Sequence, residues 1–202
     1  MRNIFALCLL GVMVLSLTGC ITPAPGPESR FYQLQPVLGA PAGDQQPEEV
    51  LVRIGPVAVA EYLDHPQMVS RVSEHEVSYD ELRRWAGSLD ENIAAVIAAN
   101  VASAVPTVRV VPYSGLPAPN FAIALSVSIH IARLDRYAGG KVVLQASWAV
   151  ISKERDAAPT TGAVRFEKTA ASSSTEDMVA TQSELLGDLS KEIAADVAAA
   201  LK

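Results

Sequence analysis

Cysteine and histidine are scarce in this chain, and each shortage excludes a class of protein. The only cysteines among its 202 residues are Cys8 and Cys20, too few for a fold that depends on a disulfide framework. The three histidines, His65, His75 and His130, do not stand at metal-ligand spacing with one another, with a cysteine or with an acidic residue on a helix. We therefore expect neither disulfide bonds nor a metal site.

Positive charge is also limited, since 16 Lys and Arg side chains face 22 Asp and Glu, for a formal net charge of −6. No basic cluster offers the footprint that a phosphate backbone requires, so we expect no nucleic-acid partner. Phosphate loops of the G-x-G-x-x-G or P-loop kind are absent, and no serine stands in a G-x-S-x-G elbow. The sequence therefore predicts no catalytic or cofactor-binding residues, and we do not expect an enzyme.

One long apolar run is present, and it precedes a cysteine. Arg2 is followed by apolar residues at 4–15, a stretch too short to span a bilayer of about 30 Å as a helix but typical of a signal peptide. Residues 17–20 read Leu-Thr-Gly-Cys, which resembles the bacterial lipobox. We predict that residues 1–19 are removed and that Cys20 receives diacylglycerol and an N-acyl chain. The alternative is an ordinary secretory signal in which Cys20 happens to follow Gly19.

Lipidation of Cys20 determines the expected location. Two or three acyl chains anchor a protein stably, because each buried CH₂ contributes about 0.8 kcal/mol. In the sorting rule of Gram-negative bacteria an aspartate after the cysteine favours the inner membrane, and here that residue is Ile21. We therefore expect the periplasmic face of the outer membrane. Residues 20–29, which are rich in proline, are predicted to form a tether of roughly 3 Å per residue.

Residues 30–202 are expected to form a single α+β periplasmic domain, with an antiparallel sheet of about five to seven strands and two long helices packed on one face. Alternating or continuous apolar runs predict strands at residues 31–36, 50–60, 107–113 and 161–170, two short strands within 65–79, and a long hairpin over 121–154. Gly55-Pro56 indicates a bulge or an edge position, and Gly139-Gly140 the turn of the hairpin.

Two helices are predicted from capping residues and helical spacing. Ser78 and Glu81 match an S-x-x-E capping box, with Val77 and Leu82 as a hydrophobic staple, and apolar residues then recur at helical spacing to residue 105. In this register Asp80 and Glu81 lie in the first turn, where carboxylates complement the helix dipole. The second helix is predicted to begin at a Ser174 and Asp177 cap and to carry Leu186, Leu189, Ile193, Val197 and Leu201.

The stretch "EYLDHPQMVSRV", residues 61–72, combines an aromatic residue, a turn and an arginine beside a pair of strands. Tyrosine and arginine are enriched in binding hot spots. The candidate contacts with a partner protein are Tyr62, Leu63, Asp64, Pro66, Arg71 and Trp85. The alternative is structural: Tyr62 and Leu63 are buried at a strand end, Arg71 is paired with a carboxylate, and Trp85 belongs to the core.

Several stretches, in this order, resemble the PqiC (YmbA) family. They are the lipobox followed by "FYQLQP", then "IGPVAVAEYLDHPQMVSR", "ELRRWAGSLDENI", "FAIALSVSIHIARLD" with "GGKVVLQASWAV", and "LLGDLSKEIAADV". Together they run from about residue 31 to residue 200. Phe31 stands where many relatives have tyrosine, and His65 replaces an arginine expected between Asp64 and Pro66. The second difference weakens any role that needs a permanent positive charge in that turn.

The resemblance implies an outer-membrane lipoprotein of an ABC-type intermembrane transport system. Its partners would be an MCE-domain periplasmic protein and an inner-membrane permease, and its role to support lipid transport and envelope integrity. MCE assemblies are commonly ring-shaped, and the small residues on one face of the 121–131 strand are compatible with a homo-oligomer.

Two other functions are open at this point. One is a stand-alone periplasmic lipid-binding lipoprotein, with a groove between the apolar sheet face and the alanine-rich helices. The other is a periplasmic hydrolase, in which Asp64 would orient the imidazole of His65, although the sequence Asp64-His65-Pro66 is more typical of a turn.

Overall fold

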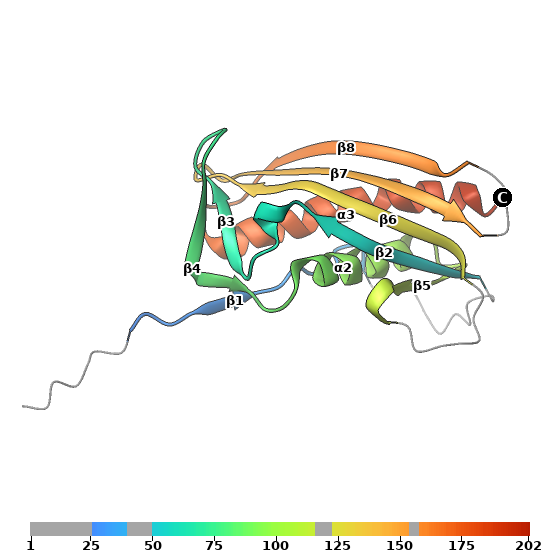
Figure 1. Ribbon diagram of the computed structural model, residues 1–202, viewed down its shortest axis with the longest axis horizontal. Helices are drawn as coiled ribbons and strands as arrows, with labels where there is room; N and C mark the ends of the chain where they lie inside the picture. Colours follow the sequence, from blue (N-terminus) through green and yellow to red (C-terminus); the bar gives the residue numbers. More distant parts are fainter. Residues whose placement is uncertain (1–25, 40–49, 116–122, 154–157) are drawn as a thin grey trace, which may run out of the picture.

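A computed structural model describes residues 26–39, 50–115, 123–153 and 158–202. Two long helices, α2 (Leu89–Ala104) and α3 (Thr175–Ala200), lie side by side on one face of a five-stranded sheet, and a three-stranded sheet stands at one end of it (Figure 1). The predicted α+β class and the predicted helices on one face are confirmed. The described strands number eight and belong to two sheets.

The five-stranded sheet has the order β5-β2-β6-β7-β8. Its strands are β2 (Leu51–Val59), β5 (Arg109–Pro112), β6 (Ile123–Arg136), β7 (Lys141–Ser152) and β8 (Thr160–Thr169). β6, β7 and β8 are antiparallel neighbours, as predicted, but β2 runs parallel to both β5 and β6, so the sheet is mixed. Parallel neighbours need a crossover connection, and here β3, β4 and α2 lie between β2 and β5 in the chain.

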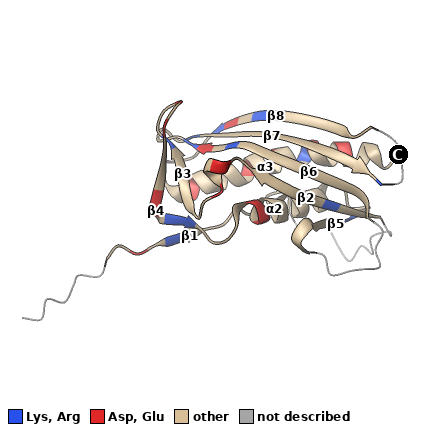
Figure 2. Cartoon of the chain, viewed as in Figure 1, with Lys and Arg blue, Asp and Glu red and all other residues tan. Residues whose placement is uncertain are grey.

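The three-stranded sheet, called here the small sheet, has the order β1-β4-β3. β3 (Gln67–Arg71) and β4 (Val77–Trp85) form the predicted pair of strands, and β1 (Arg30–Tyr32) pairs with β4 in parallel. Charged side chains of both signs lie along β4, with basic residues where β4 meets β1 (Figure 2).

The capping box predicted at Ser78 and Glu81 is wrong, and so is the staple of Val77 and Leu82. Both pairs lie in strand β4, because the tertiary pairing of this segment with β3 overrides a four-residue local signal. The carboxylate of Asp80 accepts hydrogen bonds from the backbone N–H groups of Leu82 and Arg83, each at 3.0 Å, and makes a local turn within the strand.

Helix α2 begins one turn after β4. Its N-cap is Ser88, and the acidic residues of its first turn are Asp90 and Glu91 rather than Asp80 and Glu81. From Leu89 onward the predicted helical spacing is correct, since Leu89, Ile93, Val96, Ile97 and Asn100 are all buried.

Other local predictions are confirmed. Ser174 caps α3, and its Oγ accepts a hydrogen bond from the backbone N–H of Asp177 at 3.1 Å. Gly140, with φ at 85°, lies in the turn of the β6–β7 hairpin. Gly55 has φ at 111°, and the pairing of β2 with β6 shifts register between Ile54 and Val57, which is a bulge. Because β2 lies inside the sheet, Gly55-Pro56 is not an edge position.

The segment after β1 leaves the small sheet and lies against the two helices. Leu34 is buried, and the backbone N–H groups of Val37 and Leu38 both donate to Oδ1 of Asn100 on α2, at 3.0 and 3.1 Å. The N–H of Gln35 donates to Ser183 Oγ on α3 at 3.1 Å. The predicted strand at residues 31–36 therefore ends at Tyr32, because the following backbone groups bind helix side chains instead of a strand.

The core fills the space between the five-stranded sheet and the helices. The inward side chains of β6, Leu125, Val127, Ile129 and Ile131, are all buried, as their alternation predicts. They meet the buried stripes of α2 and α3, whose largest fully buried members include Ile93, Ile97, Leu185 and Leu186.

Several sequence predictions fall outside the described residues. These are the signal peptide, the lipidation of Cys20, residues 20–25 of the tether, and parts of the predicted loops. The domain boundaries therefore remain predictions. In the part of the chain that is described, no helix is long and apolar enough to cross a membrane.

Candidate functional site

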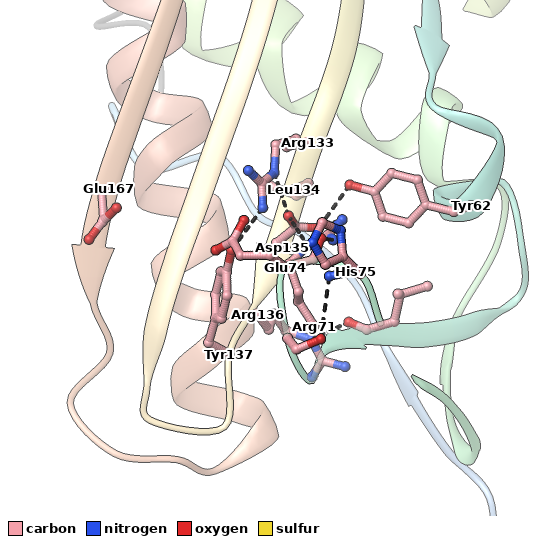
Figure 3. A network of polar contacts seen from close by, with 12 residues as sticks. Tyr62, Arg71, Glu74, His75, Arg133, Leu134, Asp135, Arg136, Tyr137 and Glu167 are labelled. Atoms are coloured by element: carbon pink, nitrogen blue, oxygen red, sulfur yellow. Dashed lines mark hydrogen bonds and ion pairs between the residues drawn. The ribbon is translucent and has the colours of Figure 1, made fainter. Parts of the chain in front are cut away.

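A buried carboxylate lies where the small sheet meets the five-stranded sheet. The side chain of Asp135, next to the end of β6, is only 1% exposed. It accepts hydrogen bonds from Tyr62 Oη at 2.8 Å, Arg71 Nε at 2.7 Å and Arg133 Nε at 2.7 Å (Figure 3). We call Asp135 with these three donors the Asp135 cluster.

The Asp135 cluster brings together three separate elements. Tyr62 lies in η1 (Glu61–Leu63), a single helical turn that follows β2, while Arg71 ends β3 and Arg133 lies on β6. η1 is held at its start because the N–H of Ala60 donates to the carbonyl of Ile131 on β6 at 2.9 Å. Leu63, the last residue of η1, is buried in the core.

The charges of the cluster favour an ionised carboxylate. Burial alone would raise the pKa of Asp135, but hydrogen bonds from Arg71, Tyr62 and Arg133 outweigh it and hold the pKa below its usual value. Burial, followed by the hydrogen bond to Asp135 and its charge, raises the pKa of Tyr62 to about 12, so the phenol stays protonated and donates. Burial would lower the pKa of Arg71, but the hydrogen bond to Asp135 outweighs this effect and raises the pKa above its usual value.

A third cation, Arg136, is buried and also binds the small sheet. Its Nε donates to the carbonyl of Val69 at 3.2 Å and its Nη2 to Ser70 Oγ at 3.3 Å, both on β3. Burial lowers the pKa of Arg136 to about 10, because no ion pair with a described carboxylate offsets the loss of water. Arg136 and the Asp135 cluster together hold β3 against the end of β6.

The structure divides the six predicted contact residues into two groups. Leu63 and Trp85 are buried in the core, Arg71 is mostly buried, and Tyr62 is half-buried with its hydroxyl on Asp135. Four of the six thus fit the structural alternative. Asp64 and Pro66 are exposed, together with His65 between them, and we call these three residues the 64–66 turn.

Tyr79 is an exposed neighbour of the 64–66 turn that was not among the predicted contacts, because it stands where the predicted strands were expected to give way to a helix. The ring of Tyr79 meets that of His65 edge-on, with centroids 5.0 Å apart, and its hydroxyl donates to the carbonyl of Tyr62 at 3.4 Å. The predicted turn at residues 64–66 is therefore flanked by an aromatic side chain from β4.

Asp135, Arg133 and Arg136 were also missed. They are 73, 71 and 74 residues from Tyr62, and sequence spacing does not report such contacts. One signal was available, since "RLDRY" places three charges at the end of a strongly apolar strand. Charges that continue a buried strand need partners, which is the arrangement found.

The sheet has a second, open face, away from the helices. A hollow of about 620 Å³ lies on it, lined by small side chains such as Ala58, Ser128, Ser147 and Ala163. The groove suggested between the apolar sheet face and the helices is instead filled by the core. In the described part of the chain, no three or more His, Cys, Asp or Glu side chains are grouped so that they could hold a metal ion.

Comparison with known proteins gives both a family and a fold. A family described as ABC-type transport auxiliary lipoprotein component matches residues 32–194. The crystal structure of an uncharacterized protein aligns with a TM-score of 0.69 at 18% identity, covering 85% of this chain and 99% of that chain. Protein XCC0632 from Xanthomonas campestris, of the DUF330 family, aligns with a TM-score of 0.59 at 12% identity, covering 81% and 92%. No curated protein sequence matches significantly.

Proposed function

Because the chain belongs to the family of ABC-type transport auxiliary lipoprotein components, we propose that it is the outer-membrane lipoprotein of an MCE-type lipid transport system. Lipid on Cys20 holds the domain on the periplasmic face of the outer membrane, where it binds an MCE-domain protein that works with an inner-membrane permease. The protein acts by binding rather than by catalysis, and it needs no cofactor besides its covalent lipid. Its role supports envelope integrity.

One structural observation supports a docking role for the 64–66 turn. The turn is exposed, yet buried Leu63 and the bond from Tyr62 to Asp135 fix it from beneath. A turn that is already ordered loses less conformational entropy on binding than a mobile loop. The adjacent ring of Tyr79 adds the aromatic surface that is common in binding hot spots.

The contact residues therefore have two roles. Asp64, His65, Pro66 and Tyr79 touch the partner, whereas Tyr62 and Arg71 hold the turn in position. Replacement of Tyr62 or Arg71 is expected to weaken association indirectly, by loosening η1 and β3.

The anchoring and the partner are tested by affinity purification from detergent-solubilised envelopes, with partners identified by mass spectrometry. The intact lipoprotein is expected to recover an MCE-domain protein, and a Cys20→Ala form to recover less of it, because the anchor positions the contact. Recovery of only unrelated envelope proteins by the intact form would remove the transport proposal.

The docking surface is tested in the same assay with a charge reversal. Asp64→Arg combined with Tyr79→Ala is expected to reduce recovery of the MCE-domain protein at least tenfold, which corresponds to about 1.4 kcal/mol. Glu192→Arg makes the same charge change on an exposed position of α3 and is the matched control. Equal recovery with both variants would exclude the 64–66 turn from the interface.

A second candidate function is lipid binding by the domain itself, which the hollow on the open sheet face favours. Its lining includes Pro56, Ala58, Ala149 and Ala163, so it is partly apolar. Under this proposal phospholipid co-purifies with a Cys20→Ala form, and mass spectrometry detects it. Protein free of phospholipid leaves docking as the function.

A further inference from the structure

Exposed apolar side chains lie on the small sheet next to the start of the described chain. Phe31 on β1 is 64% exposed and Leu82 on β4 is 38% exposed. The two strands are neighbours, with β1 paired to the end of β4 (Figure 1). Large apolar side chains that gather at one place on a surface indicate a contact with a partner or a membrane.

The register of β1 and β4 determines which side chains point outward. Tyr32 is paired with Trp85, and Phe31 with Arg84. Successive side chains of a strand point to opposite faces. Because Trp85 is buried, it and Tyr32 face inward, and Phe31 and Arg84 face outward. Leu82 lies just before the stretch of β4 that pairs with β1, beside the local turn made by Asp80, and its side chain is also exposed.

Arginines accompany the apolar residues at this place. Arg30 and Arg83 are register partners on β1 and β4, and Arg84 follows directly, so basic residues of the two strands lie side by side (Figure 2). Arg83 is bound to Asp80 at 2.6 Å. Arg30 and Arg84 form no ion pair with any carboxylate in the described part of the chain. Their guanidinium groups are therefore available to phosphate, which arginine binds in a bidentate manner.

The position of the tether indicates that this part of the small sheet contacts the membrane. Ten residues separate Cys20 from Arg30, a distance of at most about 35 Å when fully extended. The chain therefore arrives from the lipid anchor directly at β1, and among the described elements the small sheet is the first to follow the anchor. An aromatic side chain with flanking arginines suits the boundary between acyl chains and phosphate headgroups.

We propose that the β1 edge of the small sheet, with Phe31 and Arg84 on one face, Arg30 on the opposite face and exposed Leu82 beside them, rests on the phospholipid leaflet that holds the anchor. We call this set the membrane-side face. Phe31 and Leu82 enter the interface, and the two arginines bind headgroup phosphates. This contact fixes the orientation of the domain, so that the lipid on Cys20 is not its sole attachment. The inference rests on the proposed lipidation of Cys20.

The test uses the mature lipidated protein in vesicles of phosphatidylethanolamine and phosphatidylglycerol. Cleavage removes Cys8 and lipid blocks Cys20, so Phe31→Cys and Leu82→Cys each give one site for a spin label. Labels at positions 31 and 82 are expected to be more accessible to oxygen dissolved in lipid than to an aqueous nickel complex. Ile151→Cys, an exposed apolar position on β7, is the matched control and should be reached mainly by nickel.

The outcomes separate this inference from the anchoring on which it rests. If the protein floats with the vesicles and position 31 is as accessible to nickel as position 151, the membrane-side face is wrong while the anchor stands. If the protein does not float, both are wrong. Broadening of the spectrum at position 31 by a second label nearby would show that this face contacts a second copy of the chain. That result would also overturn the inference.

Charge reversal tests the contribution of the two arginines separately from that of the apolar side chains. Arg30→Glu combined with Arg84→Glu, with a spin label at Leu82→Cys, should shift the label toward nickel accessibility, whereas Glu192→Arg should not. An unchanged label in the reversed variant would exclude the phosphate contacts.

Discussion

The side-chain amide of Asn92 binds both backbone groups of Leu34. Its Oδ1 accepts from the N–H of Leu34 at 2.8 Å, and its Nδ2 donates to the carbonyl of Leu34 at 3.3 Å. The two residues are 58 positions apart, on α2 and on the segment that follows β1. Asn100, also on α2, binds the N–H groups of Val37 and Leu38, so α2 fastens the part of the chain that connects to the tether.

Asn92→Ala is therefore expected to loosen the segment at residues 33–39. Two hydrogen bonds are lost, and the free energy of unfolding should fall by about 1–2 kcal/mol. Hydrogen exchange at the amide of Leu34 should become faster, because Asn92 is its acceptor. Gln33→Ala, at an exposed neighbouring position, is the control and should change neither quantity. An unchanged exchange rate for Leu34 in Asn92→Ala would contradict the described contact.

Asp135→Asn is expected to weaken the junction between the two sheets. At neutral pH the free energy of unfolding should fall by about 3 kcal/mol, because two largely buried arginines lose their carboxylate. Asp80→Asn, which removes a more exposed carboxylate, should cost less. Urea unfolding of both variants tests this order, and the reverse order would show that the Asp135 cluster is not the stronger contact.

The pH dependence of stability offers an independent check on Asp135. Its pKa is lower in the folded state than in the unfolded chain, where it is about 3.9. The stabilisation is therefore complete above that value and is lost as the pH falls through the folded pKa. Asp135→Asn should reduce the slope of the unfolding free energy in this acid range. An identical slope in the variant would mean that the pKa of Asp135 is the same in the folded and unfolded states.

The stabilisation from Tyr62 is expected to be lost in alkali rather than in acid. Its folded pKa of about 12 lies above the value of about 10 in an unfolded chain. The contribution of Tyr62 is complete below the unfolded value and is lost as the pH rises through the folded one. Tyr62→Phe should remove this alkaline loss and cost about 1 kcal/mol at neutral pH. Phenolate absorbance should lose its component near pH 12; retention of that component would assign it to another tyrosine.

Gly162→Ala is expected to disturb the contact between β8 and the indole of Trp148. Gly162 and Trp148 are register partners, and an added Cβ would overlap the ring. The ring is also held by its Nε1, which donates to Asp196 Oδ2 on α3 at 2.8 Å. The variant should lose about 2 kcal/mol of stability. Gly87→Ala, where no atom lies near the new Cβ, is the control.

The coupling of these two positions is measurable in a double-mutant cycle. In a Trp148→Leu background the effect of Gly162→Ala should largely vanish, because the ring that it strikes is gone. Equal losses in both backgrounds would show that Gly162 is required for a reason other than its approach to the indole.

The parts of the fold that depend on neighbouring residues were predictable from the sequence. The β6–β7 hairpin follows from strict alternation and a Gly-Gly turn, the start of α3 from Ser174, and the bulge in β2 from Gly55-Pro56. The resemblance to the PqiC family is likewise confirmed by the family match over residues 32–194. Each signal lies within one short stretch of chain.

The capping box at Ser78 and Glu81 shows where local reasoning fails. The four-residue pattern fits a helix start, but β3 supplies a strand partner whose pairing the local pattern does not contain. The direction of β2 was missed for the same reason, since an apolar strand reads alike in a parallel and an antiparallel pair.

The Asp135 cluster could be predicted only in part. The structural alternative for Arg71 required a carboxylate but did not identify it, because Asp135 lies 64 residues away on another sheet. This contact shows that Tyr62 and Arg71 support the 64–66 turn, whereas Asp64 and Pro66 are exposed on it. The sequence alone does not distinguish these two groups.

The central claim, that an MCE-domain protein docks on the 64–66 turn, is tested most directly by photocrosslinking in intact cells. A photoreactive residue is placed at Asp64, and at Ile151 as a control on an exposed position of β7. We predict a crosslink to an MCE-domain protein from position 64 and none from position 151. Absence of that crosslink from position 64, in cells whose outer membrane contains the lipoprotein at its normal level, would contradict the claim.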